Sequence, residues 1–335
     1  MAQEKGKKTI YDIAKAADVS PTTVSRALNH PELVSQETLS SIQDAIKTLN
    51  FSSSRGSKKQ SSPVVLFLSS EMPNSFSTDL LSGMIRSVKQ RDVFLLTSHF
   101  KVNADNISSF ISMLKSSHVV GVITADCMSL ELLKKISQVC PVVQAGERNA
   151  ASELPYVGID DHEATRKAMS HLLSIGRRRI ALINGPLEYS YARTRLESYR
   201  TFIQDNGLDI PENWIVSLPQ IDYALAYSTA VQLLSYKERP DAIFCSSDVL
   251  AVAVNYAARE LNVKVPEDLA VIGFDNSLFS AISSPPITTI SQPTYQIGFS
   301  AAQMLFDLLN DPLSNPGSLT FPTELIVRGS TLANM

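Results

Sequence analysis

The sequence has few cysteines and a single tryptophan, and it lacks any long apolar run. No stretch approaches the ~18–20 apolar residues that a membrane-spanning helix needs, so we expect no membrane partner. The cysteines, Cys127, Cys140 and Cys245, are widely spaced and odd in number, which indicates reduced thiols rather than a disulfide framework. The N-terminal segment MAQEKGKKTIYDIAKAA has no apolar signal-peptide core, so the sequence predicts a cytoplasmic protein.

The signatures of common catalytic and cofactor sites are also missing. The chain contains no G-x-G-x-x-G, Walker A, G-x-S-x-G or H-E-x-x-H motif. Its histidines, at positions 30, 99, 118, 162 and 171, show no metal-ligand spacing with each other or with cysteine. We therefore expect no cofactor, no metal and no enzymatic activity.

Charge is unevenly distributed along the 335 residues. The formal net charge is −3 and the isoelectric point is about 6.0, an average that argues against a nucleic-acid partner. Residues 1–60, however, carry nine Lys or Arg and six Asp or Glu, a net +3, which leaves −6 for the remainder. A small basic module thus precedes a larger acidic body, although short basic N-termini are often merely solvated.

Residues 9–50 have the pattern of three short helices. Thr9, Ser20 and Ser35 are in position to cap them, and Pro21 stands at the first position of the second helix, where its missing N–H costs nothing. The apolar residues that repeat at helical spacing are Ile10, Ile13, Ala14, Ala17, Val24, Leu28, Leu39, Ile42, Ile46 and Leu49. Two helices joined by a four-residue turn around Asp18 predict a helix-turn-helix, whose second helix enters the DNA major groove.

From residue 64 onward, apolar strands alternate with amphipathic helical stretches. VVLFLS, VFLLTS, VVGVIT, PVVQAG, YVGID, RIALIN, DAIFCS and LAVIGFD are typical of buried strands, and two short strands follow near 319–328. Continuous apolar strands joined by helices predict parallel sheets covered on both faces. Roughly ten strands are many for one domain, so we predict an all-α helix-turn-helix head followed by an α/β body of two doubly wound parallel-sheet subdomains.

Domain boundaries follow from the same patterns. The DNA-binding head is expected over 1–51, and the linker SSSRGSKKQSSP over 52–63, because this segment has no large apolar residue with which to fold alone. The effector-binding and dimerisation domain is expected over 64–335. The ranges predicted for its N-subdomain and C-subdomain are about 64–160 plus 292–322 and about 161–291 plus 323–335.

The head carries a specific family motif. V-S-x-x-T-V-S-R-x-L-N, here Val19 to Asn29, resembles the start of the lactose/galactose repressor family, and the resemblance extends along nearly the whole chain. It implies a periplasmic-binding-protein-like body, a homodimer and double-stranded operator DNA as a partner. The alternative for the head alone is a three-helix bundle that contacts another protein.

The resemblance also implies DNA-contacting residues, position by position. Those expected at base edges are Pro21, Thr22 and Arg26, and those expected at phosphates are Thr9, Ser20, Thr23, Ser25 and Asn29. Arginine can pair bidentately with guanine. Pro21 departs from the polar or aromatic residue often found at its position, and it offers only apolar contact, for instance to a thymine methyl.

The linker departs from the family pattern. Relatives usually have a hinge helix of the form P-x-x-x-A-x-x-L, whose leucine wedges into the minor groove; here the alanine and leucine positions fall near Ser57 and Gln60. Arg55, Lys58 and Lys59 are expected to contact phosphates, but no apolar wedge is present. We therefore predict weaker DNA bending than in the family.

Several residues of the body are candidates for an effector site, because ligands of open α/β sheets bind at the carboxyl ends of strands. The resemblance implies that Asp275 binds sugar or ribose hydroxyls and that Arg195 meets the polar edge of the ligand. Ser247 also ends a strand and is preferred as a ligand contact to Asp248, which is expected to cap the next helix. Simple structural roles remain open: a turn or helix cap for Asp275, and a surface ion pair for Arg195.

Aromatic residues complete the predicted site. Phe76 matches a family position at which a ring stacks on the ligand, and Tyr189 and Tyr191 lie on the loop that leads to Arg195. Either tyrosine is able to stack on a base or a pyranose. Packing in the core or on the surface is an equally weighted alternative for all three rings.

The effector class is suggested by local resemblance. GFDNSLFSAISSPPITTISQPTYQIG and ELIVRGST are more similar to nucleoside-responsive members of the family than to sugar-responsive ones. We therefore expect a nucleoside effector, with a sugar or sugar phosphate as the alternative. The competing protein classes are a solute-binding protein, which has no DNA-binding head, and, more remotely, an enzyme acting on sugars or nucleosides. The chain ends soon after VRGST without a tetramerising heptad segment, so we expect a dimer.

Overall fold

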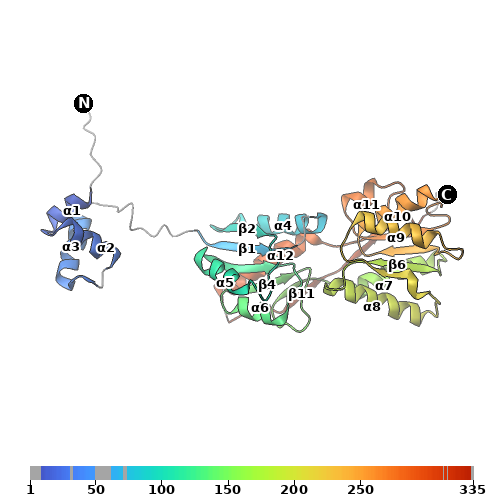
Figure 1. Ribbon diagram of the computed structural model, residues 1–335, viewed down its shortest axis with the longest axis horizontal. Coiled ribbons are helices and arrows are strands. Elements are labelled where there is room, and N and C mark those ends of the chain that lie inside the picture. The colour runs from blue at the N-terminus through green and yellow to red at the C-terminus, as the bar shows by residue number, and fades with distance from the viewer. Residues whose placement is uncertain are drawn as a thin grey trace, which may run out of the picture. The chain divides into compact units, whose positions relative to one another are not determined.

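Two separate units make up the chain, Met1–Ser61 and Ser62–Met335. The computed structural model describes residues 9–30, 33–49, 62–70, 74–311, 313–314 and 316–332 (Figure 1). In the first unit, the head, α1 (Ile10–Ala16), α2 (Pro21–Asn29) and α3 (Gln36–Thr48) confirm the three predicted helices.

Hydroxyl caps start the helices of the head. The hydroxyl oxygens of Ser20 and Ser35 accept hydrogen bonds from the backbone N–H groups three residues later, at 3.0 and 3.3 Å. The backbone N–H and hydroxyl of Thr9 both donate to the Asp12 carboxylate, at 2.7 and 2.9 Å. Every apolar residue predicted for the core packs into one cluster, at whose centre lie the buried side chains of Ile13, Ala14, Val24, Ala27, Ile42 and Ala45.

A tight turn at Asp18 sets the angle between α1 and α2. Asp18 has a φ of +54°, a left-handed conformation that aspartate adopts more readily than most residues. The N–H of Ala17 donates to the Ile13 carbonyl at 2.8 Å, and that of Val19 donates to the Ala14 carbonyl at 3.0 Å. These bonds close the end of α1 and place Ser20 at the start of the next helix.

The second unit, the body, contains two six-stranded sheets. The strand order in the first is β11 (Ser318–Phe321), β5 (Tyr156–Ile159), β4 (Val142–Ala145), β3 (Val119–Thr124), β1 (Val64–Leu68) and β2 (Phe94–Ser98). The order in the second is β12 (Glu324–Ile326), β10 (Thr288–Ser291), β9 (Ala270–Asp275), β8 (Ala242–Cys245), β6 (Ile180–Asn184) and β7 (Ile215–Ser217). We call the parts built on them the N-subdomain and the C-subdomain. The predicted fold class is confirmed.

Helices cover the sheets of the body (Figure 1). Those of the N-subdomain are α4 (Ser75–Val88), α5 (Ile107–Ser116), α6 (Leu130–Ser137) and α12 (Thr294–Asn310). Those of the C-subdomain are α7 (Asp161–Ser174), α8 (Ser190–Asp205), α9 (Tyr223–Leu234), α10 (Asp248–Glu260) and α11 (Leu278–Ile282). Inner strands such as β1 and β6 are buried along their whole length because the sheet is covered on both faces, whereas the edge strands β2 and β11 are largely exposed.

The chain passes between the subdomains three times, and each passage starts at the carboxyl end of a strand. β5 leads into α7, β10 leads into α12, and β11 leads into β12. Since β4 and β11 run parallel to β5, and β9 runs parallel to β10, the carboxyl edges of both sheets face the opposite subdomain. This geometry decides where a cavity between the subdomains must form.

The structure differs from the prediction in four small elements. β12 pairs antiparallel with β10, so the second sheet is not wholly parallel. The short strands β7 and β10 and the five-residue helix α11 were not predicted. All three are too short to show a hydrophobic period, and α11 leaves most of its apolar side chains exposed.

Close packing against α12 fixes the position of α4, the N-subdomain helix whose N-terminus lies at the cavity. A Cβ added to Gly83 would lie 2.0 Å from the Tyr295 carbonyl oxygen, and one added to Gly298 would lie 2.0 Å from that of Leu80. The two helix backbones therefore touch, and only glycine allows this approach. The N-terminus of α4 is thereby fixed at the edge of the cavity.

Candidate functional site

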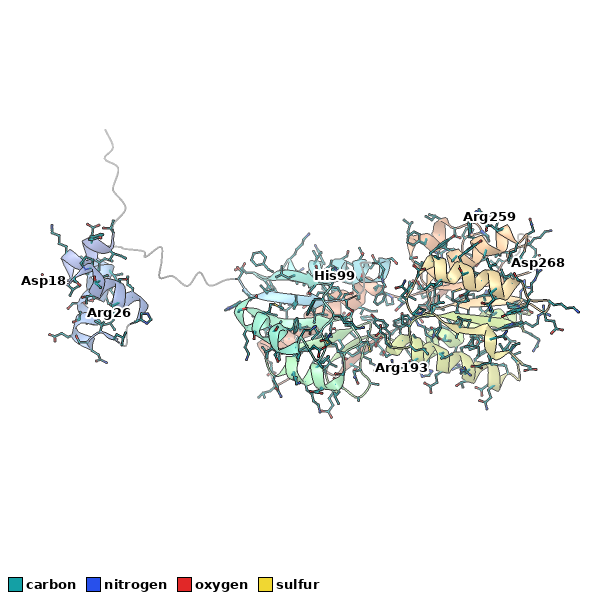
Figure 2. The ribbon with its side chains drawn as sticks, viewed as in Figure 1. Asp18, Arg26, His99, Arg193, Arg259 and Asp268 are labelled. Atoms are coloured by element: carbon teal, nitrogen blue, oxygen red, sulfur yellow. The ribbon has the colours of Figure 1, made fainter. Side chains whose placement is uncertain are left out.

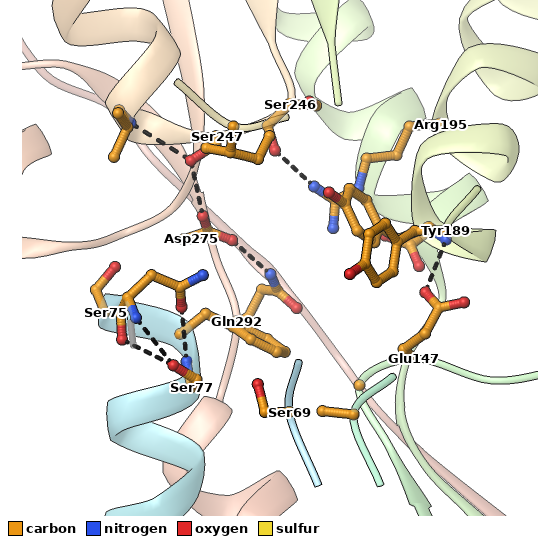
Figure 3. A pocket seen from close by; sticks show the side chains of 18 of the residues that line it. Ser69, Ser75, Ser77, Glu147, Tyr189, Arg195, Ser246, Ser247, Asp275 and Gln292 are labelled. Atoms are coloured by element: carbon orange, nitrogen blue, oxygen red, sulfur yellow. Dashed lines mark hydrogen bonds and ion pairs between the residues drawn. The ribbon is translucent and has the colours of Figure 1, made fainter. Parts of the chain in front are cut away.

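A cavity of about 300 Å³ lies between the carboxyl edges of the two sheets. Its lining includes all six residues predicted for the effector site: Phe76, Tyr189, Tyr191, Arg195, Ser247 and Asp275 (Figure 3). They come from both subdomains and are brought together from positions up to two hundred residues apart. The structure thus gathers the predicted residues at one place; that they bind an effector stays a prediction.

Asp275 is the most constrained of these residues. It ends β9 with a φ of +106°, a conformation that costs a non-glycine residue on the order of 1–3 kcal/mol. Its carboxylate accepts hydrogen bonds from the Ser247 hydroxyl at 3.3 Å and from the Gln292 side-chain amide at 2.7 Å (Figure 3). Burial, with a further contribution from the Asp248 carboxylate, raises the pKa of Asp275 to about 7. It faces the cavity and caps no helix.

The expectation that Asp248 caps α10 is wrong. Ser247 is the N-cap of α10, and the Asp248 carboxylate instead accepts hydrogen bonds from the Ser277 backbone N–H and the Thr289 hydroxyl, both at 2.6 Å. A Cβ at Gly273 would lie 2.3 Å from Asp248 Oδ1, so the absence of a side chain at this position of β9 leaves room for the Asp248 carboxylate. Asp248 therefore ties the start of α11 to β10, immediately behind Asp275.

Arg195 lies on α8 with only 4% of its surface exposed, so the alternative of a surface ion pair does not hold. Its Nε donates to Asp161 at 2.8 Å and its Nη1 donates to the Ser246 carbonyl at 2.8 Å. The guanidinium carbon lies 3.4 Å from the ring centre of Phe274 and 4.8 Å from that of Tyr191. The arginine is consequently held by an ion pair and by two aromatic rings.

The aromatic side chains form walls of the cavity. Phe76 packs against Gly146, where an added Cβ would lie 2.5 Å from the ring. The rings of Tyr189 and Tyr191 lie 5.6 Å apart and are tilted by 30°. Ile221 and Phe279 add apolar surface. A flat, mainly apolar ligand moiety has aromatic faces available on more than one side.

The sequence analysis missed several polar residues of the lining, among them Glu147, Asp161 and Gln292. Each of these three follows the carboxyl end of a strand, namely β4, β5 and β10. The rule that led to Ser247 and Asp275 applies equally to them, so the signal was present in the sequence.

Glu147 joins the two subdomains. It follows β4 of the N-subdomain, yet its carboxylate accepts hydrogen bonds from the backbone N–H groups of Ser190, at 2.7 Å, and Tyr191, at 3.4 Å, in the first turn of α8. Burial raises the pKa of this carboxyl to about 7, although the two N–H groups act in the opposite direction. The cavity is therefore bridged by a carboxyl that releases its proton near neutral pH.

The second candidate site is the outer face of α2 in the head. Thr22 and Arg26 (Figure 2) are exposed, whereas Pro21 and Ser25 are half-buried. The hydroxyls of Ser20 and Thr23 lie 2.8 Å apart, so one hydroxyl hydrogen of this pair remains for a phosphate oxygen.

Three groups of predicted DNA contacts are not placed on this face. The Thr9 hydroxyl donates to Asp12 and would have to break that bond to reach a phosphate. The side chain of Asn29 lies outside the described residues, as do Arg55, Lys58 and Lys59 of the linker. These contacts stay predictions.

Among the residues whose placement is described, no group of three or more His, Cys, Asp or Glu is arranged to hold a metal ion. Within the same ranges, no helix has the length and apolarity needed to cross a membrane.

Comparisons with known proteins agree with this division into head and body. The model of bacterial regulatory proteins of the lacI family matches residues 9–54, and that of a periplasmic binding protein-like domain matches residues 169–331. The transcriptional repressor CytR of Escherichia coli K12 is 30% identical over 97% of this chain and 96% of its own length. The ribose operon repressor of the same strain is 30% identical over 96% and 99%.

A solved structure shows the same similarity in three dimensions. The transcriptional regulator CelR in complex with cellobiose is 27% identical, covers 96% of this chain and 99% of its own, and superposes with a TM-score of 0.72. The similarity therefore includes both the head and the body.

Replacing Glu147 by Gln is expected to make the protein more stable than the wild type as pH rises. The folded state holds the Glu147 proton up to about pH 7, whereas the unfolded state loses it near the ordinary value of 4.5. The wild type therefore loses stability relative to E147Q between these limits, by up to about 3 kcal/mol. Urea unfolding at a series of pH values from 5 to 8 measures the difference. The control is Glu197→Gln, whose side chain is 72% exposed; a wild-type minus E147Q difference that is constant with pH would contradict the expectation.

Proposed function

The chain belongs to the lacI family of bacterial regulatory proteins, and we propose that it is a transcriptional repressor whose affinity for operator DNA is changed by a nucleoside bound in the cavity of its body. The observation that supports this most is the occurrence, in one chain, of a helix-turn-helix head and of a cavity lined by residues from two subdomains. A solute-binding protein has no such head. A protein that binds bacterial chromosomal DNA acts in the cytoplasm.

We propose the head to be residues 1–51, the linker 52–63 and the effector-binding and dimerisation domain 64–335. In the head, Pro21, Thr22 and Arg26 are proposed to read base edges from the major groove. The hydroxyls next to them contact phosphates and fix the register. The relatives are repressors, so we expect no chemical conversion of the effector.

The chemistry of the cavity suits a nucleoside. At one end, Asp275, Ser247 and Gln292 offer a carboxylate, a hydroxyl and an amide to vicinal hydroxyls. Phe76 and Tyr191 offer aromatic surface to a base. A free sugar is the second candidate, because the ribose operon repressor is as similar to this chain as CytR is.

The effector acts by changing the balance between two arrangements of the subdomains. Gln292 and Asp161 lie at passages between the subdomains and also line the cavity. A ligand that bonds to Asp275 competes with the Gln292 amide, and it thereby changes the interactions at a passage. Coupling of this kind between two sites typically amounts to 1–3 kcal/mol.

Asp275→Asn is expected to abolish the effector response and to leave operator binding intact. The variant replaces a charged acceptor by a neutral amide, which weakens effector binding by roughly ten- to hundredfold. Titration calorimetry with a panel of nucleosides and sugars, and operator binding with and without the ligand that binds, measure both properties. Asp209→Asn, at an exposed position outside the cavity lining, is the control. An Asp275→Asn protein that responds normally would disprove the assignment.

Arg26→Ala is expected to weaken operator binding by about 1–3 kcal/mol and to relax the sequence preference at one base pair of each half-site. The removed guanidinium is exposed on α2, where it can reach a guanine edge. Binding is measured on an operator selected from a random oligonucleotide pool and on unrelated DNA. Arg86→Ala, which removes an exposed positive charge from the body, is the control. Equal weakening on both DNAs would reduce Arg26 to a phosphate contact.

We also propose that the protein is a homodimer held by exposed apolar surface on the body. Leu278 and Ile282 of α11 are 71% and 67% exposed, and Phe94 and Leu96 lie exposed on the edge strand β2. In Figure 1, α11 and β2 both lie along the upper side of the body, one in each subdomain. Apolar patches of this kind mark association surfaces, and two of them on one side of the body suit a two-fold interface.

The double variant Leu278→Glu, Ile282→Glu is expected to be monomeric, because two like charges would meet their symmetry mates in a desolvated interface. Light scattering over a range of protein concentrations measures the molar mass. Leu313→Glu alters an exposed leucine outside both patches and should leave the mass of the wild type unchanged. A wild-type tetramer, or a double variant that remains dimeric, would argue against this surface.

A further inference from the structure

The cavity has an excess of carboxyl groups over positively charged groups. Among the described residues that line it, the charged side chains are Glu147, Asp161, Asp275 and Arg195. Three carboxyl groups thus accompany a single guanidinium. A ligand in this cavity is therefore surrounded by more carboxyl groups than positively charged groups.

The guanidinium of Arg195 is already neutralised. Asp161 accepts from its Nε and the Ser246 carbonyl accepts from its Nη1, both at 2.8 Å. The ring of Phe274 lies against one part of its surface and that of Tyr191 is also close. An anionic ligand would therefore have to compete with a buried carboxylate for this arginine.

The other feature able to bind an anion is the N-terminus of α8. Helix N-termini attract negative charge because their first N–H groups have no partner within the helix. α8 begins after Tyr189, whose side chain makes no cap hydrogen bond, and the N–H groups of Ser190 and Tyr191 are bound by Glu147 instead. The opposite subdomain thus supplies, through the Glu147 carboxyl group, the hydrogen-bond acceptor at this helix end.

We propose that Glu147 excludes phosphorylated ligands from the cavity, so that the regulator responds to an unphosphorylated nucleoside and does not respond to the phosphate ester of that nucleoside. The inference rests on the proposed function and narrows it. It makes Glu147 a selectivity residue, because its carboxylate occupies the helix end that a phosphoryl group would otherwise use.

The electrostatics of the lining support this role. Burial already raises the pKa values of the cavity's own carboxyl groups, to about 7 for both Glu147 and Asp275. Negative charge is thus unfavourable in this space even when it belongs to the protein. A phosphate monoester would add a further charge of about −1.5 to −2 at neutral pH. Hydroxyl and amino groups of a ligand, in contrast, can donate hydrogen bonds to the carboxyl groups, so they are compatible with this cavity.

The test compares nucleosides with their 5′-monophosphates by titration calorimetry on the full-length protein. We use the wild type, Glu147→Gln, which keeps the shape of the side chain, Glu147→Ala, which exposes the helix end, and Glu197→Gln as the charge-matched surface control. The wild type and the control are expected to bind the nucleoside at least roughly a hundredfold more tightly than the monophosphate. In both Glu147 variants this ratio should fall by at least roughly tenfold, through a gain in monophosphate affinity.

A second readout needs no knowledge of the effector. Inorganic phosphate should raise the melting temperature of Glu147→Ala and leave those of the wild type and Glu197→Gln unchanged. If sugars bind in place of nucleosides, the proposed effector class is wrong, and ribose with ribose 5-phosphate tests the exclusion in the same way. The inference is overturned if the wild type binds the phosphorylated form as tightly as the free form. It is also overturned if folded Glu147 variants keep the wild-type ratio and gain no stability from phosphate.

Discussion

The direction of the parallel strands at the three passages is the constraint on which the rest of the body depends. β5, β10 and β11 each leave their sheet at the carboxyl end and lead directly into the other subdomain. All parallel neighbours must end at the same edge, so loops from both sheets meet across a narrow space. Every polar residue of the cavity lining discussed above follows from this arrangement, and two of them lie on the passages themselves. These positions support the proposal that ligand binding and a change in the arrangement of the subdomains depend on the same few residues.

Several groups that line the cavity have an energetically unfavourable conformation or environment. Asp275 has a strained backbone, and three carboxyl groups are buried with raised pKa values. Close hydrogen bonds compensate in part, from Gln292 to Asp275 and from the α8 N-terminus to Glu147. A ligand that donates hydrogen bonds to these buried carboxyl groups would therefore lower the free energy of the site. The same unfavourable burial of carboxyl groups supports the proposed selectivity of the cavity against anionic ligands.

Much of the fold was predictable from the sequence, because helical and strand periods are long and regular in this chain. The caps at Ser20 and Ser35 and the core of the head are local features that the pattern specifies directly. β7 and α11 escaped prediction because three or five residues carry no period. The cap of α10 was misassigned since Ser246, Ser247 and Asp248 are all able to cap, and only distant partners, Ser277 and Thr289, decide among them.

The six candidate residues of the site were found by a rule about strand ends together with family resemblance, and the rule alone would have added Glu147, Asp161 and Gln292. Their partners were not predictable. That Glu147 reaches α8 depends on how two subdomains meet, which no spacing along the chain encodes. The pairing of Arg195 with Asp161 has the same origin.

The three passages also set the order in which the protein matures on the ribosome. The head is contiguous and complete once its third helix has emerged, whereas the sheet of the N-subdomain lacks its edge strand until β11, near the end of the chain, is made. Domains fold as units during synthesis, so the DNA-reading part is finished long before the ligand-sensing part can close. A truncated chain would therefore retain the DNA-binding head without the body that is proposed to regulate it. The body itself cannot be divided into two independently translated halves.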